Sequence, residues 1–202
     1  MRKRLDAAGL LLTATALAGQ LVLSLMHREA GVGETLLRFF GYFTILTNLL
    51  VGLYFLARVR DGRPAWLAAP GAITAVTAYI LVVGLVYQLV LRGTWSPTGW
   101  QRVVDELLHT VNPLFVLVYW RRFAGPGDCR WGAVGPWLAY AVGYLLWVTL
   151  LGLSAGFYPY PFVDAVALGY GRVALNALVI VLLMLGLLAL LIGIGRRRAG
   201  AG

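Results

Sequence analysis

The sequence predicts an all-α membrane protein, a bundle of six transmembrane helices that forms a single domain over residues 1–202. Apolar residues make up 60% of the 202 residues and charged residues only 12%, and a soluble domain of this length cannot bury that much apolar surface. Six apolar segments are long enough to cross a bilayer core, which takes about 20 helical residues. They do not alternate as barrel strands would, so helices must satisfy their backbone groups in lipid.

Basic residues are distributed unevenly between the two sides of the predicted bundle. Twelve of the 17 Lys and Arg residues lie within residues 2–4, 58–63, 121–130 and 196–198, which the segments place on one side. Because Lys and Arg are enriched in cytoplasmic loops, we expect both termini in the cytoplasm. Topology and anionic lipid head groups explain the net charge of +9. No basic stretch is interleaved with groups that read bases, so we expect no nucleic-acid partner.

The first segment, residues 7–26, follows the basic start MRKR and contains Ala16-Leu17-Ala18, a pattern also typical of cleaved signal peptides. Its apolar run continues past this point to Met26, so we expect a retained helix.

The second segment, residues 36–57, contains "YFTILTNL", in which Thr44, Thr47 and Asn48 recur at helical spacings of three and four. Such groups can bond to a carbonyl of their own helix or join helices together. They can also line a pathway or carry out chemistry. The third, fifth and sixth segments, residues 66–91, 132–153 and 170–194, are predicted as spans by their length and apolar content.

The fourth segment, residues 103–120, carries the ionisable residue His109 in "DELLHTVNPLF". Asp105 lies one turn before it and Asn112 nearly one turn after it, so the three share a helix face. Pro113 removes the hydrogen bond to the carbonyl of His109, and we expect a kink beside the imidazole. A histidine that only joins helices is the alternative to a functional site.

Thr44 and His109 are expected at the same depth below the outer boundary of the membrane. Thr44 lies six residues after the boundary residue Arg38, and His109 lies seven after Arg102. A rise of about 1.5 Å per residue places both roughly 10 Å below the outer boundary, and Thr47 nearer 14 Å. A hydroxyl against an imidazole, with a carboxylate behind it, is the general arrangement of an activated nucleophile.

Two connections carry further candidates. In "GFYPYPFVDA", residues 156–165, the prolines prevent a regular helix. The loop either forms an interfacial turn with its aromatic rings in the membrane belt, or covers the bundle with Asp164 reaching inward. Cys129, the only cysteine, allows no disulfide within the chain, and we expect a reduced surface thiol.

Several chemistries are disfavoured. Zinc sites need about three protein ligands, and the chain has only His27 and His109. A metal held by His109 with Asp105 and Asp164 is therefore the weaker alternative, and we expect neither metal nor cofactor. The sequence contains no Gly-rich phosphate loop, G-x-S-x-G elbow or CxxC motif.

The motifs "YFTILTNLLV", "LLHTVNPLFVLVYW" and "YPYPFVDA" together resemble the androgen-induced and androgen-dependent family of six-pass membrane proteins, especially its bacterial branch. The resemblance spans the second to the sixth segment. The helix type and the charge bias predict a multi-pass protein of the cytoplasmic membrane, and the Ala, Gly and Arg-rich usage together with the closer family branch indicates a bacterial source. Animal members hydrolyse fatty acid esters of hydroxy fatty acids, with a threonine nucleophile and a histidine base. By motif these roles fall on Thr44 and His109.

One departure leaves the nucleophile open. Animal members place Asn or Asp three residues after the threonine, where this sequence has Thr47, followed by Asn48. The resemblance implies a lipid ester as substrate and acyl transfer as the reaction. Asp105 or Asp164 could orient the imidazolium. Asn48, Asn112 or Tyr160 could donate a hydrogen bond to the oxyanion. The alternatives are a proton-coupled transporter with a relay through His109 and a non-catalytic lipid-binding subunit.

Overall fold

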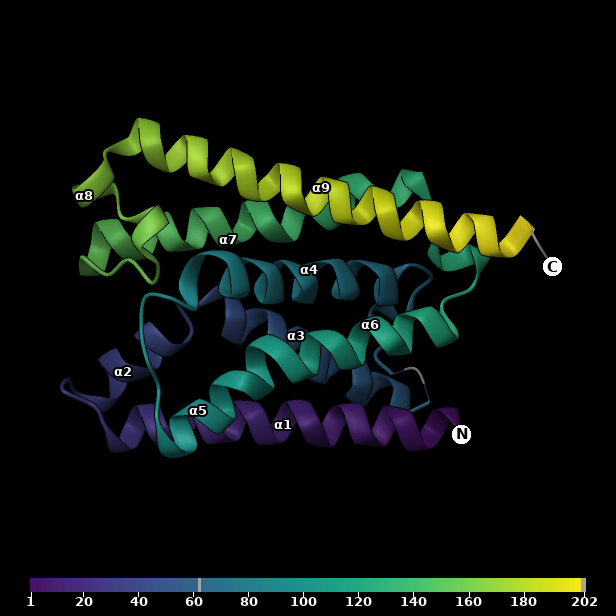
Figure 1. Cartoon of the computed structure of the whole chain (residues 1–202), viewed down its shortest axis with the longest axis horizontal. Coiled ribbons are helices and arrows are strands. Elements are labelled where there is room, and N and C mark those ends of the chain that lie inside the picture. The colour runs from purple at the N-terminus through teal and green to yellow at the C-terminus, as the bar shows by residue number, and fades with distance from the viewer. Residues whose placement is uncertain (62, 201–202) are drawn as a thin grey trace.

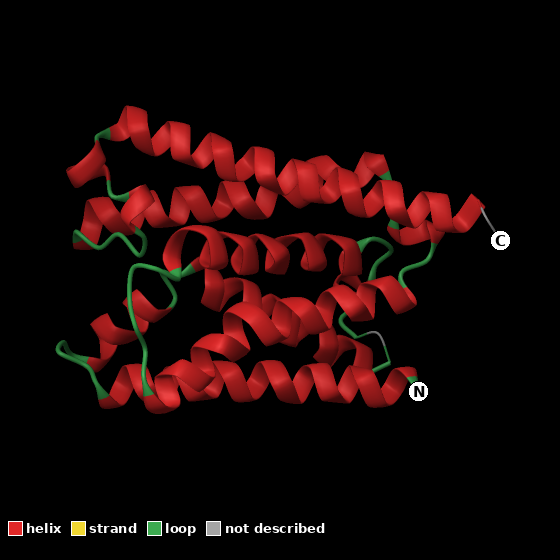
Figure 2. Cartoon of the chain, in the orientation of Figure 1, coloured by secondary structure: helices red, strands yellow, loops and turns green. Residues whose placement is uncertain are grey.

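The computed structural model describes residues 1–61 and 63–200, and every regular element in these ranges is a helix (Figure 1, Figure 2). The all-α prediction is therefore confirmed. Two π-helical turns, Tyr87–Leu91 and Leu107–Val111, extend α4 and join α5 to α6, respectively. The α-helices are α1 Arg2–Met26, α2 Val32–Phe39, α3 Phe43–Val59, α4 Ala72–Val86, α5 Gly99–Glu106, α6 Asn112–Phe123, α7 Val134–Ala155, α8 Ala165–Leu168 and α9 Tyr170–Gly200.

Several helices are long and apolar enough to cross a membrane, which indicates a membrane protein. Four qualify singly: Arg2–Met26, Ala72–Leu91, Pro126–Ala155 and Tyr170–Arg198. The pair α2 and α3 makes a fifth if the two count as one bent span.

Helix α4 occupies the centre of the bundle, with α3 and α6 on one side and α9 on the other (Figure 1). Small residues allow its neighbours to approach closely. A Cβ at Gly84 would lie 3.2 Å from the Cβ of Pro113 and 3.3 Å from the carbonyl oxygen of His109. Gly84 is therefore the place where α4 accommodates the proline and the histidine backbone of the fourth segment.

The second predicted span is not one helix. Residues 36–57 divide into α2 and α3, whose axes differ by 76° across a short break. The break begins after Phe39 and ends before Phe43. The single-helix prediction over this segment is therefore wrong.

The kink predicted beside His109 takes the form of the π-helical turn Leu107–Val111. Pro113 has no N–H to bond the carbonyl of His109. The amide of Asn112 bonds to the carbonyl of Leu107, five residues earlier, where an α-helix would use the carbonyl four residues earlier. Turns of this kind are frequent at functional sites.

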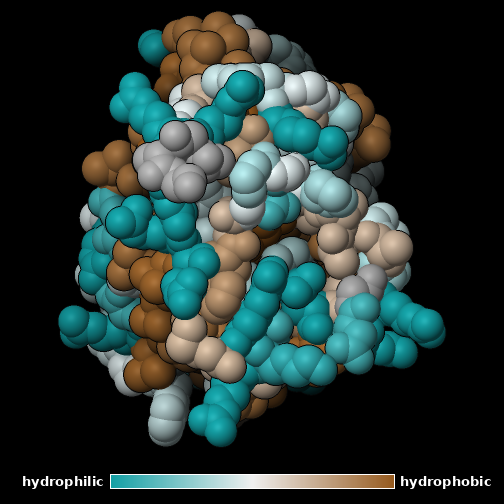
Figure 3. Space-filling model, turned by 90° about the vertical axis from the view of Figure 1, so that its right-hand side faces the viewer, coloured by the Kyte–Doolittle hydropathy of each residue, from teal (hydrophilic) through white to brown (hydrophobic). Residues whose placement is uncertain are grey.

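Both termini lie at the same end of the bundle (Figure 1). The clusters within residues 2–4, 58–63, 121–130 and 196–198 belong to the connections and helix ends on this side. Seen from this end, hydrophilic side chains cover much of the surface, and hydrophobic ones lie beside them (Figure 3). We call this surface the basic end.

Cys129 is buried, with a relative exposure of 2%, so the prediction of a surface thiol is wrong. A Cβ at Gly195 would lie 2.2 Å from its Sγ, so the loop packs against α9. Asp128 holds the loop there, because its carboxylate accepts hydrogen bonds from the amides of Gly71 at 2.9 Å and Gly125 at 2.9 Å. Two backbone donors on different segments thus depend on one carboxylate.

We expect Asp128→Ala to release this loop and expose Cys129. The substitution leaves two part-buried amides without an acceptor, at a cost of about 1–3 kcal/mol. The measurement is the rate of maleimide labelling of Cys129 in detergent, which should rise well above the wild-type rate. Asp61→Ala is the control, because Asp61 pairs only with exposed Lys3. Rapid labelling of the folded wild type would contradict the prediction.

Candidate active site

The break between α2 and α3 places a helix start inside the bundle. Two carbonyls of the break after α2 accept hydrogen bonds from side chains of α7. The indole of Trp147 donates to the carbonyl of Phe40 at 3.0 Å, and the hydroxyl of Tyr144 donates to that of Gly41 at 3.1 Å. A Cβ at Gly41 would lie 2.8 Å from Leu151 Cδ2, so α7 packs directly on this backbone. Contacts with α7 therefore stabilise the break, which needs no proline.

Thr44 is the second residue of α3, so no preceding helical turn of α3 offers a carbonyl to its hydroxyl. Its Oγ1 lies 3.3 Å from His109 Nε2 and 3.2 Å from the Tyr160 hydroxyl, and its own amide donates to that hydroxyl at 3.2 Å. The side chain is buried at 7% exposure. Other hydroxyls bond to the carbonyl four residues earlier in their own helix, as expected of side chains that serve only packing. They are those of Thr13, Thr35, Thr77, Thr149 and Ser154. Thr44 instead faces an imidazole.

His109 is held from its other ring nitrogen by Asp105. Its Nδ1 lies 3.0 Å from the backbone oxygen of Asp105 and 3.1 Å from Oδ1 of the same residue. Both partners are acceptors, so we assign the proton to Nδ1. This assignment leaves Nε2 as the hydrogen-bond acceptor that faces Thr44.

Tyr87, which the sequence analysis did not single out, completes this side of the site. Its ring stacks on the imidazole of His109 at 4.1 Å with an interplanar angle of 16°. Its hydroxyl donates to Oδ2 of Asp105. Tyr87 therefore fixes both the plane of the His109 ring and the position of the Asp105 carboxylate. In the sequence, its place at the end of an apolar segment indicated only an interfacial tyrosine.

Below the site, buried amides link α1, α3 and α6. Asn48 Nδ2 donates to the carbonyls of Thr44 at 2.8 Å and Leu108 at 3.5 Å, and Asn112 Nδ2 donates to Asn48 Oδ1 at 2.6 Å. Thr13 Oγ1 donates to Asn112 Oδ1 at 3.1 Å. The side chains of Thr13, Asn48 and Asn112 are fully buried. The two asparagines therefore position the helices, and neither directs a free N–H at Thr44, as an oxyanion donor would.

The structure separates the two threonines that the sequence left as alternatives. Thr47 Oγ1 lies 2.9 Å from the hydroxyl of Tyr140 on α7. It is fully buried and lies on neither of the two cavities described below. The geometry therefore favours Thr44 as the reactive hydroxyl.

The loop after α7 contributes a tyrosine to the site and not its aspartate. Tyr160 is buried at 8% exposure and stacks on Phe162 at 5.1 Å. Asp164 Oδ1 accepts hydrogen bonds from the amides of Val166 at 2.9 Å and Ala167 at 3.0 Å and so caps α8. The inward orientation of Asp164 is therefore wrong. No group of three or more His, Cys, Asp or Glu side chains within residues 1–61 and 63–200 is placed to hold a metal ion.

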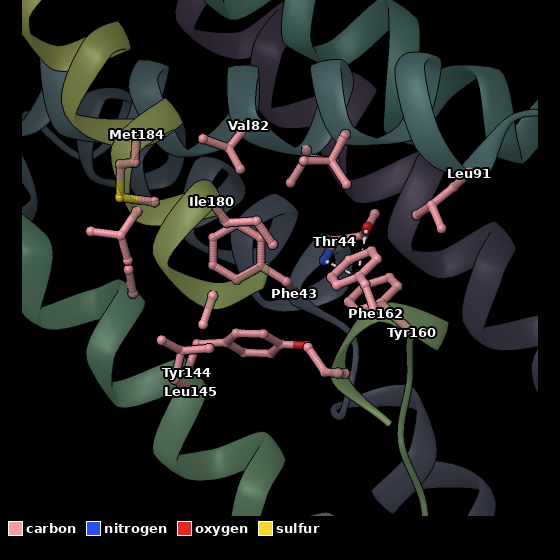
Figure 4. Close-up of a pocket in the computed structure, with 16 residues that line it drawn as sticks. Phe43, Thr44, Val82, Leu91, Tyr144, Leu145, Tyr160, Phe162, Ile180 and Met184 are labelled. Atoms are coloured by element: carbon pink, nitrogen blue, oxygen red, sulfur yellow. Dashed lines mark hydrogen bonds between the residues drawn. The ribbon is translucent and has the colours of Figure 1, made fainter. Parts of the chain in front are cut away.

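Two cavities meet at Thr44. The polar vestibule, of about 550 Å³, opens at the end of the bundle opposite the termini and is lined by Arg38, Gln101, Asp105 and His109, among others. The apolar cleft is narrower, about 50 Å³, and lies among α3, α4, α7 and α9. Figure 4 shows Thr44 and Tyr160 at one end of this cleft and Met184 at the other. Both Thr44 and Tyr160 also line the vestibule.

No family model, curated protein or solved structure matches the chain.

We expect Asn112→Leu to destabilise the protein. It removes the donor to Asn48 Oδ1, and a buried polar group left unpaired costs about 1–3 kcal/mol. Thr13 keeps its bond to the carbonyl of Gly9. The midpoint of thermal unfolding in detergent should fall clearly. Thr149→Val is the matched control, because Thr149 is exposed and bonds only to its own helix. Equal midpoints for the two variants would show that the amide network does not hold the helices.

Proposed function

We propose that this chain is an intramembrane hydrolase of lipid esters, with Thr44 as nucleophile and His109 as general base. The observation that carries the proposal is the approach of Thr44 Oγ1 to His109 Nε2, at 3.3 Å, with Asp105 behind the imidazole. A nucleophile, a base and a group that orients the base in one line are the signature of nucleophilic catalysis. Hydroxyl–base distances commonly exceed hydrogen-bond ideals in the absence of substrate.

In the proposed reaction, His109 Nε2 takes the proton from Thr44 Oγ1 as this oxygen attacks the ester carbonyl. The imidazolium, stabilised by Asp105, then gives the proton to the departing alcohol oxygen, and the acyl group remains on Thr44. Water from the vestibule is deprotonated by His109 and attacks the acyl-threonine. This second step releases the fatty acid and restores the threonine hydroxyl.

Tyr160 is the best-placed group for the oxyanion. Its hydroxyl lies 3.2 Å from Thr44 Oγ1 and accepts the Thr44 amide at 3.2 Å. The amides at the start of a helix favour negative charge, so α3 polarises the hydroxyl that donates to the substrate oxygen. Preorganised donors of this kind account for much of the rate of acyl transfer.

The proposed topology has six spans, with α5 and α6 together forming the fourth and α2 and α3 together the second. Both termini lie at the basic end, so cytoplasmic termini follow from the excess of Lys and Arg there. The vestibule then opens on the outer side of the cytoplasmic membrane. Water reaches Thr44 from this side, and lipid reaches it from within the bilayer.

The resemblance to the androgen-induced and androgen-dependent family supports this proposal through the residues that its motifs contribute. The first motif supplies Thr44, the second His109 and the third Tyr160. These three side chains, distant in sequence, lie in contact around one hydroxyl. Membership of the bacterial branch of that family is part of the proposal.

Removal of either reacting group should abolish activity. In Thr44→Ala and His109→Ala, we expect hydrolysis of lipid esters to fall by roughly 10³-fold or more, since residues that act as a unit lose most of their effect together. The measurement combines fatty acid release with labelling by a fluorophosphonate probe, and thermal unfolding checks the fold. Thr47→Val is the control and should retain labelling. Labelling that persists in Thr44→Ala would place the nucleophile elsewhere.

The hydroxyl of Tyr160 should matter for the rate more than for binding. We expect Tyr160→Phe to lower kcat by about 10²–10³-fold, the usual loss when one oxyanion donor is removed, with a smaller change in KM. Tyr158→Phe in the same loop is the control, because the Tyr158 ring packs on Gly152 and lines neither cavity. Equal kcat values for these two variants would exclude Tyr160 as the donor.

A further inference from the structure

The two cavities that meet at Thr44 differ sharply in character. The apolar cleft is polar only at Thr44 and at the hydroxyls of Tyr144 and Tyr160, and beyond them it is walled by Phe43, Val82, Ile180 and Met184 (Figure 4). The polar vestibule has a mixed lining, in which charged and amide groups such as Arg28, Arg38 and Gln101 stand beside apolar side chains such as Ile45 and Leu108. An ester that reacts at Thr44 must therefore place its two halves in unlike surroundings.

The cleft presents apolar side chains to a hydrocarbon chain, and its free volume is about 50 Å³. Small side chains, Ala141 on α7 and Ala177 on α9, line it, and buried Met184 lies at the end away from Thr44 (Figure 4). Met has a flexible side chain that adapts to irregular apolar volumes. Leu145 and Val181 are half-buried, so the α7–α9 wall lies next to the lipid-facing surface.

We propose that the apolar cleft binds the acyl chain of the substrate, and that the polar vestibule receives the alcohol half. This inference rests on the proposed function, because it assigns the two halves of an ester cleaved at Thr44. The acyl chain stays in the cleft while its carbonyl is bound to Thr44, and the alcohol leaves toward the outer side. Water follows the same path in reverse, and the fatty acid is released sideways into lipid. The substrate class is therefore an ester of a fatty acid with an alcohol that carries at least one polar group for the charged and amide side chains of the vestibule.

The first test is the dependence of hydrolysis on acyl length. Wild type and Ala177→Leu are assayed on nitrophenyl esters with acyl chains from two to sixteen carbons, and on acetate esters of alcohols of matched length. We expect the ratio of long-chain to short-chain kcat/KM to fall about tenfold or more in the variant, as when methylenes no longer fit a pocket. The acetate esters of long alcohols should not show this fall.

Ala174→Leu is the matched control, because Ala174 lies one turn away on α9, is exposed and does not line the cleft. It should keep the wild-type ratio. Met184→Ala, which enlarges the far end, should move the preferred acyl length upward. An unchanged ratio in Ala177→Leu, or an equal loss on long-alcohol acetates, would overturn the assignment of the cleft and leave the proposed hydrolase intact.

A second measurement does not depend on catalysis. Thr44→Ala protein in lipid vesicles is irradiated with a palmitic acid that carries a diazirine near its methyl end, and the labelled peptides are mapped. We expect labels on α7 and α9 near Met184, with weaker labelling when Ala177→Leu is added but not when Ala174→Leu is added. Labels spread evenly over the lipid-facing surface would overturn the cleft. If the wild type hydrolyses no ester, the proposed function fails, and this crosslink alone decides whether the cleft binds an acyl chain.

Discussion

The start of α3 inside the bundle is the feature on which the rest of the site depends. A threonine in the middle of a membrane helix donates its hydroxyl proton to the carbonyl one turn earlier. That proton is then not directed at a base on another helix. Because α2 ends at Phe39 and α3 begins at Phe43, Thr44 lacks that carbonyl, and its amide is also free of helix bonding. One break therefore frees a hydroxyl and a backbone donor at the same point. Trp147 and Tyr144 of α7 stabilise this break in an apolar interior, because they donate hydrogen bonds to the carbonyls of Phe40 and Gly41 within it.

Thr44 and His109 are held together by contacts made elsewhere. Asn48 bonds the carbonyl of Thr44 from one turn below, and it is itself bonded by Asn112, one turn beyond His109. The backbones that carry Thr44 and His109, the proposed nucleophile and base, are thus joined through two amides at full burial, where such a bond is worth more than at a surface. Tyr87 also holds His109 in place, because its ring stacks on the imidazole and its hydroxyl donates to Asp105. Pre-organisation of this kind is what an acyl-transfer site needs, since misplacement by about 1 Å costs orders of magnitude in rate.

The contact between Thr44 and His109 could be anticipated from the sequence, although the straight helix used to measure the depth of Thr44 does not exist. Thr44 Oγ1 and His109 Nε2 do lie 3.3 Å apart, but the rise was counted along one straight helix, and α2 and α3 differ in direction by 76°. The break itself had no signal: it contains Gly41 but no proline, and partners on α7 stabilise it. The same limit explains Asp164 and Cys129. Whether a loop aspartate caps a short helix or enters a core, and whether a loop thiol is covered, depends on packing that no local pattern encodes. A strong local constraint, such as Pro113 after His109, did coincide with a departure from the regular α-helix, the π-helical turn Leu107–Val111.

The arrangement of polar groups also bears on the choice between a hydrolase and a proton-coupled carrier. A carrier needs ionisable or hydrated groups from one side of the membrane to the other. Here the polar path from the vestibule ends at Thr13, the last member of the amide network, whose hydroxyl is turned back on its own helix. The next buried polar residue of α1 toward the basic end is Asp6, paired with Tyr119. Between Thr13 and Asp6 lies Gly9, where a Cβ would come within 2.6 Å of Phe55 and 2.8 Å of Phe115. An aromatic layer thus interrupts the polar path at this point of α1. Along α1, a polar path that opens to the vestibule and ends at an aromatic layer suits a reaction that consumes water and lipid better than it suits passage of a solute.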